Sequence, residues 1–112
     1  MTSYFGNPKA KANPNSVSIA RWTPRWWGAG RRATELAPSV DLLNAIKAGE
    51  INERQYTKRY HSELLKNLDP KKVYAEYKDK ILCCYERPGE FCHRRLIAEW
   101  LEKSLGVRIP EL

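Results

Sequence analysis

The chain has 112 residues, 42% of them hydrophobic and 29% charged, and a formal net charge of +7. This length fits one compact domain over residues 1–112, because two domains would each be too small to bury a good core. The longest apolar runs fall far short of a bilayer span, and residues 1–15 lack the apolar segment of a secretory signal. The three cysteines are an odd count, which suits a reducing compartment, so we expect a cytoplasmic protein without a membrane partner.

The positive charge is concentrated in the N-terminal third of the chain. Six basic residues precede the first acidic residue, Glu35, whereas basic and acidic residues nearly cancel over the remainder. Such a local positive field predicts an anionic partner, either a nucleic acid or a small phosphate compound. The six residues are Lys9, Lys11, Arg21, Arg25, Arg31 and Arg32.

Two short strands and a loop are predicted in this basic third. Residues 2–5 form an aromatic strand that the breakers at 6–8, GNP, would end. Residues 16–22 form a second strand, which is β-branched near its start. Residues 28–32, GAGRR, are basic and punctuated by glycine, so we expect a loop there.

Three helices are predicted over the middle of the chain, at residues 38–49, 52–68 and 70–77. Apolar residues of the first recur on one face, and a glycine is placed to end it. The second begins with Asn52 and has Gln55 three residues later, which is the spacing of a capping box. The third opens with a proline, which the first position of a helix tolerates.

The C-terminal third contains a buried strand, a helix and a short final segment. Residues 81–86, ILCCYE, are mostly a continuous apolar run, as expected for a strand covered on both faces. Residues 92–105 show the apolar stripe of a helix, and 107–109 form a final strand. Strands that alternate with helices predict an α/β layer structure with a short, largely parallel sheet.

In such sheets, ligands bind beyond the carboxyl ends of the strands. That rule selects residues 6–8, 21–27 and 86–94, of which the first two lie in the basic third. The convergence of these three stretches predicts a site at one edge of the sheet. We expect Arg21, Glu86 and the turn at 92–94 to surround one cavity there.

The start of the last helix carries cations, Arg94 and Arg95, where the helix dipole disfavours them. Phe91 is a poor cap, so the first amides of the helix can form an anion site. On this interpretation a bound phosphate offsets the charge of Arg94, and Arg95 points outward. Arg94→Ala should then leave the stability of the ligand-free protein unchanged or slightly higher. The alternative is that both arginines face solvent and pair with Glu90, Glu99 or Glu102.

Cys92 and His93 are candidates for chemistry at the same helix start. A thiol at this position would have a lowered pKa and could act as a nucleophile, but small buried cysteines are equally common. No third group that would orient a Cys92–His93 pair can be identified from the sequence. Cys83 and Cys84 face opposite sides of a strand, so a simple disulfide is not expected. The paired spacing of zinc ligands is also missing, and we predict no metal and no cofactor.

Aromatic residues accompany the arginines at 21–27. Trp22, Trp26 and Trp27 crowd next to Arg21 and Arg25, a pattern that can stack a base and neutralise its phosphate. The alternative is that the rings close the core of the sheet. For Trp27 a pocket wall and a core position are equally compatible with the sequence.

Three segments resemble one family: SIARWTPRWW (18–27), LAPSVDLLNAIKAGEINERQYTKRY (36–60) and LCCYERPGEFCHRRLIAEWLEKSLG (82–106). They are similar to the domain-of-unknown-function family 488, and closest to its small subgroup with a PGEFCHR-like segment. The resemblance implies a small Rossmann-like three-layer domain but no established reaction. By position it carries over Arg21, Thr23-Pro24, Glu86 and the triplet 92–94.

The leading hypothesis is a module that binds a nucleotide-like small molecule bearing phosphate, and that sequesters or processes a nucleotide signal. The first alternative is a nucleic-acid-binding protein that uses the basic third. The second is a hydrolase or transferase of nucleosides or nucleotides, with Glu86, Cys92 or His93 as catalytic residues. The candidate ligand-binding residues are Tyr4, Arg21, Thr23, Trp27, Glu86, Cys92, His93 and Arg94.

Overall fold

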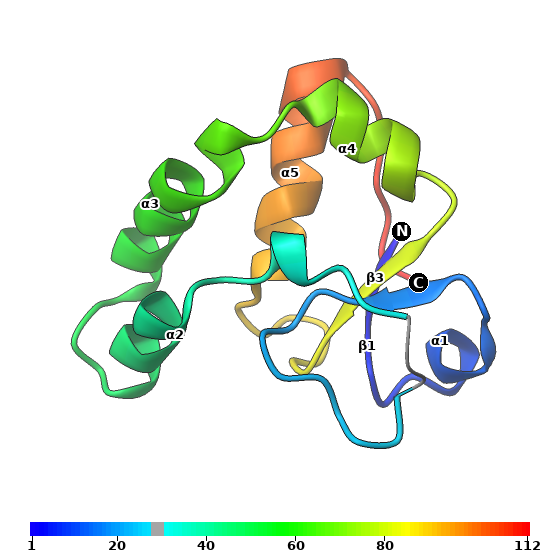
Figure 1. Cartoon of the computed structure of the whole chain (residues 1–112), viewed down its shortest axis with the longest axis horizontal. Helices are drawn as coiled ribbons and strands as arrows, with labels where there is room; N and C mark the ends of the chain where they lie inside the picture. The colour runs from blue at the N-terminus through cyan, green and yellow to red at the C-terminus, as the bar shows by residue number, and fades with distance from the viewer. Residues whose placement is uncertain (28–30) are drawn as a thin grey trace.

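A computed structural model describes residues 1–27 and 31–112 of the chain. Its centre is a three-stranded parallel sheet of β1 (Thr2–Tyr4), β3 (Ile81–Cys84) and β2 (Ser16–Ser18), with β3 in the middle (Figure 1). Leu82 of β3 is in register with Thr2 on one side and Val17 on the other. The structure therefore confirms an α/β fold with a short parallel sheet.

The central strand divides two hydrophobic clusters. All four residues of β3 are buried, and successive side chains point to opposite faces. Leu82 and Cys84 belong to the larger cluster, whereas Ile81 and Cys83 belong to the smaller one. An apolar run without polar alternation is what a strand covered on both faces requires.

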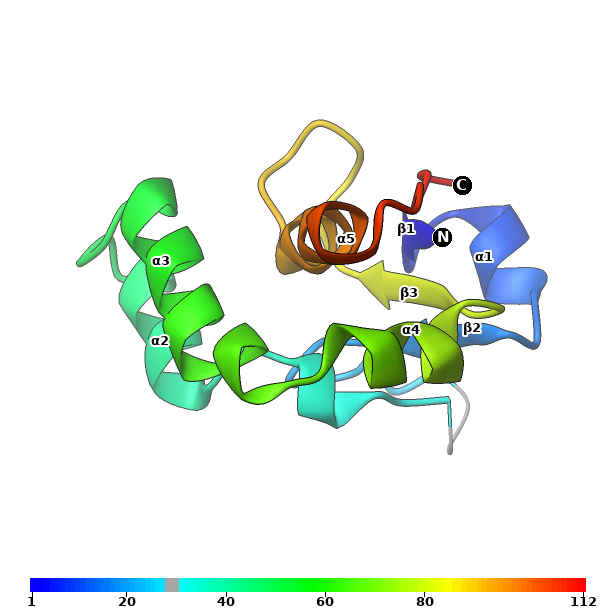
Figure 2. The ribbon, with the colours of Figure 1, turned by 90° about the horizontal axis from the view of Figure 1, so that it is seen from above.

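The larger cluster is built by the helices that follow residue 37. These are α2 (Val40–Lys47), α3 (Glu53–Glu63), α4 (Pro70–Tyr77) and α5 (His93–Leu105), with 3₁₀ turns at Thr34–Leu36 and Leu65–Asn67. Helix α5 contacts β1 and β3, and it also packs on α3 and α4. Figure 2 shows α2 and α3 at one end of the molecule and α1 at the other. No helix of the described residues is long and apolar enough to cross a bilayer.

The helix starts follow from local capping. Ser39 accepts from the amide of Leu42, and Asn52 and Gln55 form the predicted capping box. Pro70 takes the first position of α4, and Gly106 adopts a left-handed conformation after α5. The three predicted middle helices are confirmed, although the second becomes a 3₁₀ turn after Leu64.

Helix α1 (Pro8–Ala12) was not predicted, because residues 6–8 resemble a simple chain break. Asn7 accepts from the amide of Lys9, and Pro8 occupies the first helical position, so the same residues that end β1 start a helix. Ala10 is fully buried and covers the smaller cluster. Helix α1 covers that face of the sheet together with Ala20 and Trp27, which belong to the same cluster.

The three predicted strands that form are shorter than expected, and the fourth does not form. Strand β2 ends at Ser18 rather than at residue 22, because the chain beyond Ile19 leaves the sheet while Arg31–Ala33 pairs with Ser18. Of the predicted loop at 28–32, residues 28–30 lie outside the described residues. Residues 107–109 form no strand, and the C-terminal segment joins β1 through an isolated bridge between Thr2 and Glu111.

Candidate functional site

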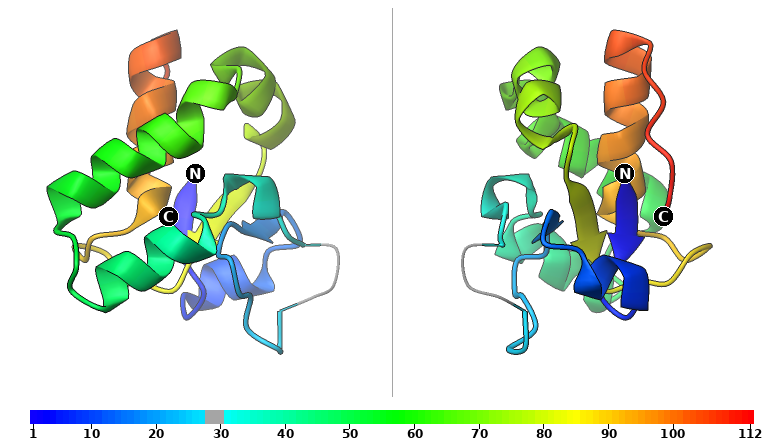
Figure 3. Two further views of the ribbon diagram at one scale, coloured as in Figure 1. Left: turned by 60° about the vertical axis from the view of Figure 1, so that its left-hand side comes forward. Right: turned by 90° about the vertical axis from the view of Figure 1, so that its right-hand side faces the viewer.

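A cavity of about 370 Å³ lies at the carboxyl edge of the sheet, where β3 ends and α5 begins. Its volume falls in the range of roughly 300–1,000 Å³ that is typical of small-molecule sites. Figure 3 shows the loop that leads from the end of β3 to the start of α5. The lining comes from four parts of the chain: Ala20, Arg21, Trp22, Pro38, Leu43, Ile46, Lys47, Tyr56, Cys84, Tyr85, Glu86, Phe91, Cys92 and His93.

The structure brings four of the candidate site residues together around this cavity: Arg21, Glu86, Cys92 and His93. They come from the segment after β2, the loop after β3 and the start of α5. These are the strand ends at which parallel sheets hold ligands. The other four candidates, Tyr4, Thr23, Trp27 and Arg94, lie outside the lining.

Arg21 provides a fixed cation in the cavity wall. Its Nε donates to the carbonyl of Pro38 at 3.0 Å, and its Nη2 donates to that of Ala37 at 3.4 Å. Lys47 lies at the same cavity, with its Nζ 5.6 Å from the centre of the Trp22 ring. Positive charge in the cavity is therefore supplied by α2 as well as by the segment after β2.

His93 is buried and held in one orientation by the chain far from it in sequence. Its Nε2 lies 2.7 Å from the carbonyl oxygen of Ile19, which can only accept, so Nε2 carries the proton and Nδ1 a lone pair. Nδ1 is 3.9 Å from Sγ of Cys92. Burial, opposed by the bond to Ile19 and reinforced by the charge of Arg94, lowers the pKa of His93 to about 4. The imidazole is therefore neutral at pH 7.

Cys92 forms a disulfide with Cys84, a pairing that the sequence did not reveal. The expectation against a disulfide considered Cys83 and Cys84, which indeed face opposite sides of β3. The loop after β3 returns to the face that carries Cys84 and places the N-cap residue of α5 beside it. Cys83 stays a free buried thiol on the other face, where burial raises its pKa to about 11.

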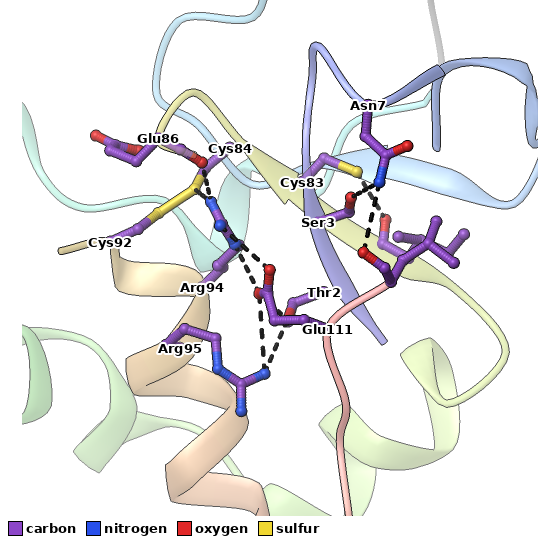
Figure 4. Close-up of polar contacts among 12 residues, drawn as sticks. Thr2, Ser3, Asn7, Cys83, Cys84, Glu86, Cys92, Arg94, Arg95 and Glu111 are labelled. Carbon is purple, nitrogen blue, oxygen red and sulfur yellow. Dashed lines mark hydrogen bonds and ion pairs between the residues drawn. A yellow bond between two sulfur atoms is a disulfide. The ribbon is translucent and has the colours of Figure 1, made fainter. Parts of the chain in front are cut away.

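Arg94 is buried to 1% exposure and does not line the cavity; its guanidinium lies among Glu111, Glu86 and Cys84 (Figure 4). Its Nε donates to Glu111 at 2.9 Å, and its Nη1 donates to the backbone carbonyl of Glu86 at 2.5 Å and to Sγ of Cys84 at 3.0 Å. These bonds do not fit the prediction that Arg94→Ala leaves the stability of the ligand-free protein unchanged or slightly higher. The carboxylate that compensates it comes from the C-terminal segment, not from Glu90 or helix α5.

Arg95 does not point outward as expected. Its Nη1 donates to the hydroxyl of Thr2 at 2.8 Å and to the carbonyl of Ile109 at 2.9 Å. Arg94 thus ties α5 to the end of β3 and to the C-terminal segment, and Arg95 ties it to β1 and to the C-terminal segment. The cations at the helix start are explained by tertiary contacts that bring a carboxylate, a hydroxyl and two carbonyls to them (Figure 4).

Glu111 makes this part of the structure sensitive to acid. Partial burial would raise its pKa, but hydrogen bonds from Arg94 and Thr2 and the charges of both arginines outweigh burial and lower it. The stability that Glu111 adds is therefore complete above its ordinary pKa of 4.5 and is lost as the pH falls through the lower folded-state pKa. We expect urea unfolding to show this loss below pH 4.5 in the wild type and not in Glu111→Gln. Equal pH profiles for the two proteins would contradict the assignment.

Trp27, Thr23 and Tyr4 have packing roles. Trp27 is 3% exposed, its Nε1 donates to the carbonyl of Arg31, and its ring lies 4.9 Å from that of Phe5. Thr23 shares a hydroxyl hydrogen bond with Ser18, and half-buried Tyr4 ends β1. Of the two environments open to Trp27, the structure shows the core position.

Sequence reasoning missed several side chains that shape the cavity. Trp22, not Trp27, lies at the wall, and Tyr56 lines the cavity with its ring 5.3 Å from that of Phe91. Leu43 and Ile46 belong to the apolar face predicted for α2, and they are half-buried at the cavity. Knowing that these side chains are only partly buried would have identified them as cavity residues, but the extent of burial along an apolar helix face cannot be derived from the sequence.

The whole cavity lies within the part of the chain that matches a known family. The family model DUF488-N3a, described as the active DUF488-N3 subclade, matches residues 7–105. The chain belongs to this family. The match confirms the resemblance of the three segments and includes every lining residue, whereas Glu111 lies beyond it. No curated protein and no solved structure matches the chain.

Proposed function

We propose that this DUF488-N3a member binds a nucleotide-like small molecule bearing phosphate in the cavity at the carboxyl edge of the sheet. The observation that carries the proposal is the combination of aromatic walls and two cations around one cavity. Trp22, Tyr56 and Phe91 offer rings for a base, while Arg21 and Lys47 offer charge for a phosphate. A mostly apolar cleft with a few polar groups is the usual form of such a site.

The polar groups suit the base and sugar as well as the phosphate. Glu86 can accept hydrogen bonds from an amino group or a hydroxyl. Burial, together with the nearby charge of Glu86, raises the pKa of Tyr56, so its hydroxyl remains a donor at neutral pH. Arg21 is the first candidate for the phosphate because two carbonyls already hold its guanidinium in place.

The size of the cavity limits the ligand. At about 370 Å³ it lies near the lower end of the range for small-molecule sites. It suits one nucleoside monophosphate better than a dinucleotide. The protein would bind this ligand in the cytoplasm, where it would sequester or process a nucleotide signal. If it also turns the ligand over as a hydrolase or transferase, Glu86 and His93 are the nearest candidates for proton transfer.

A nucleic acid is the second candidate partner, favoured by one surface feature. Trp26 is 54% exposed, and Nζ of Lys11 lies 4.6 Å from the centre of its ring. Another basic residue of this third, Arg31, instead donates to the backbone carbonyls of Ser16 and Asn13. The salt dependence separates the two: a polymer binder would lose orders of magnitude in affinity between about 50 and 200 mM salt, and a single phosphate site far less.

Calorimetric titration with AMP, GMP, CMP and UMP, and with the four nucleosides, tests the proposal. We expect at least one monophosphate to bind about 10- to 100-fold more tightly than its nucleoside, because a charge-assisted contact contributes roughly 1.5–3 kcal/mol. Arg21→Gln should remove this difference, whereas Arg25→Gln, which changes an exposed arginine nearby, should not. Equal affinity for nucleosides and monophosphates, or equal effects of both variants, would contradict the proposal.

A further inference from the structure

At the base of the cavity, two sulfur atoms and one imidazole nitrogen lie close together. In the part of the chain that the structure describes, the ligand atoms of Cys84, Cys92 and His93 all lie within 4.8 Å of one another, and all three residues are buried. Cys84 ends β3, Cys92 is the N-cap of α5, and His93 is its first residue. Two thiolates and an imidazole are a ligand set that Zn²⁺ prefers in proteins.

The surroundings of these residues match the outer shell of a metal site. A histidine ligand usually donates its second ring N–H to a carbonyl or carboxylate, which fixes the tautomer. His93 makes this bond to the carbonyl of Ile19, and its free Nδ1 faces Sγ of Cys92 at 3.9 Å. Nη1 of Arg94 lies 3.0 Å from Sγ of Cys84. A guanidinium so placed stabilises a thiolate, and a disulfide sulfur has no charge for it to compensate.

The backbone also leaves room for an ion between the sulfurs. The Cα atoms of Cys84 and Cys92 are 7.4 Å apart, beyond the roughly 4.4–6.8 Å that is usual for a disulfide. All three residues line the cavity, so a fourth position on a tetrahedral ion would face it. Three protein ligands and one open position are the arrangement of catalytic zinc sites, in contrast to closed structural ones.

We propose that, with the disulfide reduced, Cys84, Cys92 and His93 bind one Zn²⁺ ion through their two sulfurs and Nδ1, with the fourth position open to the cavity. A phosphine reductant opens the bond: phosphorus takes an oxygen atom from water, and two electrons and two protons convert the disulfide into two thiols. Zn²⁺ then displaces the two thiol protons. This zinc site is independent of the proposed nucleotide binding. Zinc binding is measured without any nucleotide, so either proposal can fail while the other holds.

The experiment measures zinc binding to the reduced chain. The protein is reduced with phosphine, stripped of metal and loaded with Zn²⁺, and the bound zinc is measured after gel filtration. In a second sample Co²⁺ replaces Zn²⁺, and its thiolate charge-transfer band and tetrahedral visible bands identify the ligands. We expect one ion per chain. Competition with a chelator then measures the zinc affinity of Cys84→Ser, Cys92→Ser and His93→Gln. Each variant removes a ligand, so each should lose more affinity than the roughly 10- to 100-fold that the loss of an outer-shell partner costs.

Two variants keep the test specific. Cys83→Ser changes a buried cysteine of the same strand that faces the other cluster, so it should still bind one ion with the charge-transfer band unchanged. His93→Gln keeps a donor for the Ile19 carbonyl while removing Nδ1, and a thermal melt without metal checks that it folds. Zinc binding that is absent in the reduced wild type, or that Cys83→Ser weakens as much as Cys84→Ser, would overturn the proposal.

Discussion

Replacing Arg94 by alanine is expected to lower the free energy of unfolding by about 3 kcal/mol, since breaking a buried ion pair leaves its partner groups uncompensated. The guanidinium is 1% exposed and bonds to Glu111, to the backbone carbonyl of Glu86 and to a cysteine sulfur. Alanine at this position would leave the Glu86 carbonyl and the Cys84 sulfur without this donor, and the Glu111 carboxylate, whose side chain is 29% exposed, without its closest cation. Urea unfolding of the two proteins at neutral pH measures the difference.

Arg95→Ala is the matched control one residue further along α5. Its side chain is 32% exposed and makes two hydrogen bonds, so its removal should cost about 1 kcal/mol. Arg94→Lys should recover little, because an ammonium cannot reach the carboxylate and the carbonyl together. A neutral or stabilising Arg94→Ala, which the dipole argument alone would give, would contradict the structural role of this residue.

Filling the cavity should abolish ligand binding while leaving the fold intact. Leu43 is half-buried on α2 and lines the cavity, so Leu43→Trp directs an indole into the proposed ligand volume. We expect the affinity for the best-binding nucleoside monophosphate to fall by roughly 100-fold or more, equivalent to about 2.8 kcal/mol. Stability should change little, since the new ring occupies open space instead of displacing packed side chains.

Val40→Trp provides the comparison on the same helix. Val40 is 43% exposed and lies outside the cavity lining, so an indole there should leave the affinity within about twofold, or roughly 0.4 kcal/mol. Calorimetric titration of both variants with the same monophosphate gives the result. If Leu43→Trp binds as tightly as the wild type, the ligand occupies some other part of the surface.

The elements that depend on neighbouring residues were predictable from the sequence. The capping box of Asn52 and Gln55 and the proline at the start of α4 each act within one turn of the chain, and the helices begin there. The apolar run of β3 likewise indicates burial on both faces, which requires no knowledge of its partners. The rule that parallel sheets bind ligands at their carboxyl edge then placed Arg21 and His93 near one cavity.

The interactions that define the site are long-range, and the sequence does not contain them. The Ile19 carbonyl that orients His93 is 74 residues away, and Glu111, which compensates Arg94, is 17 residues away at the C-terminal end. The charge of Arg94 was therefore assigned to a ligand when a carboxylate of the same chain already paired with it. The Cys84–Cys92 contact depends in the same way on the path of the loop between them.

Amide and indole NMR spectra recorded during titration with a nucleoside monophosphate test the central claim most directly. If the ligand binds in the cavity, the largest shift changes will fall on residues 20–22, 43–47, 56 and 84–93, including the indole N–H of Trp22. Shift changes centred on Lys9, Lys11 and Trp26, with the cavity residues unaffected, would contradict the claim and indicate a nucleic-acid surface instead.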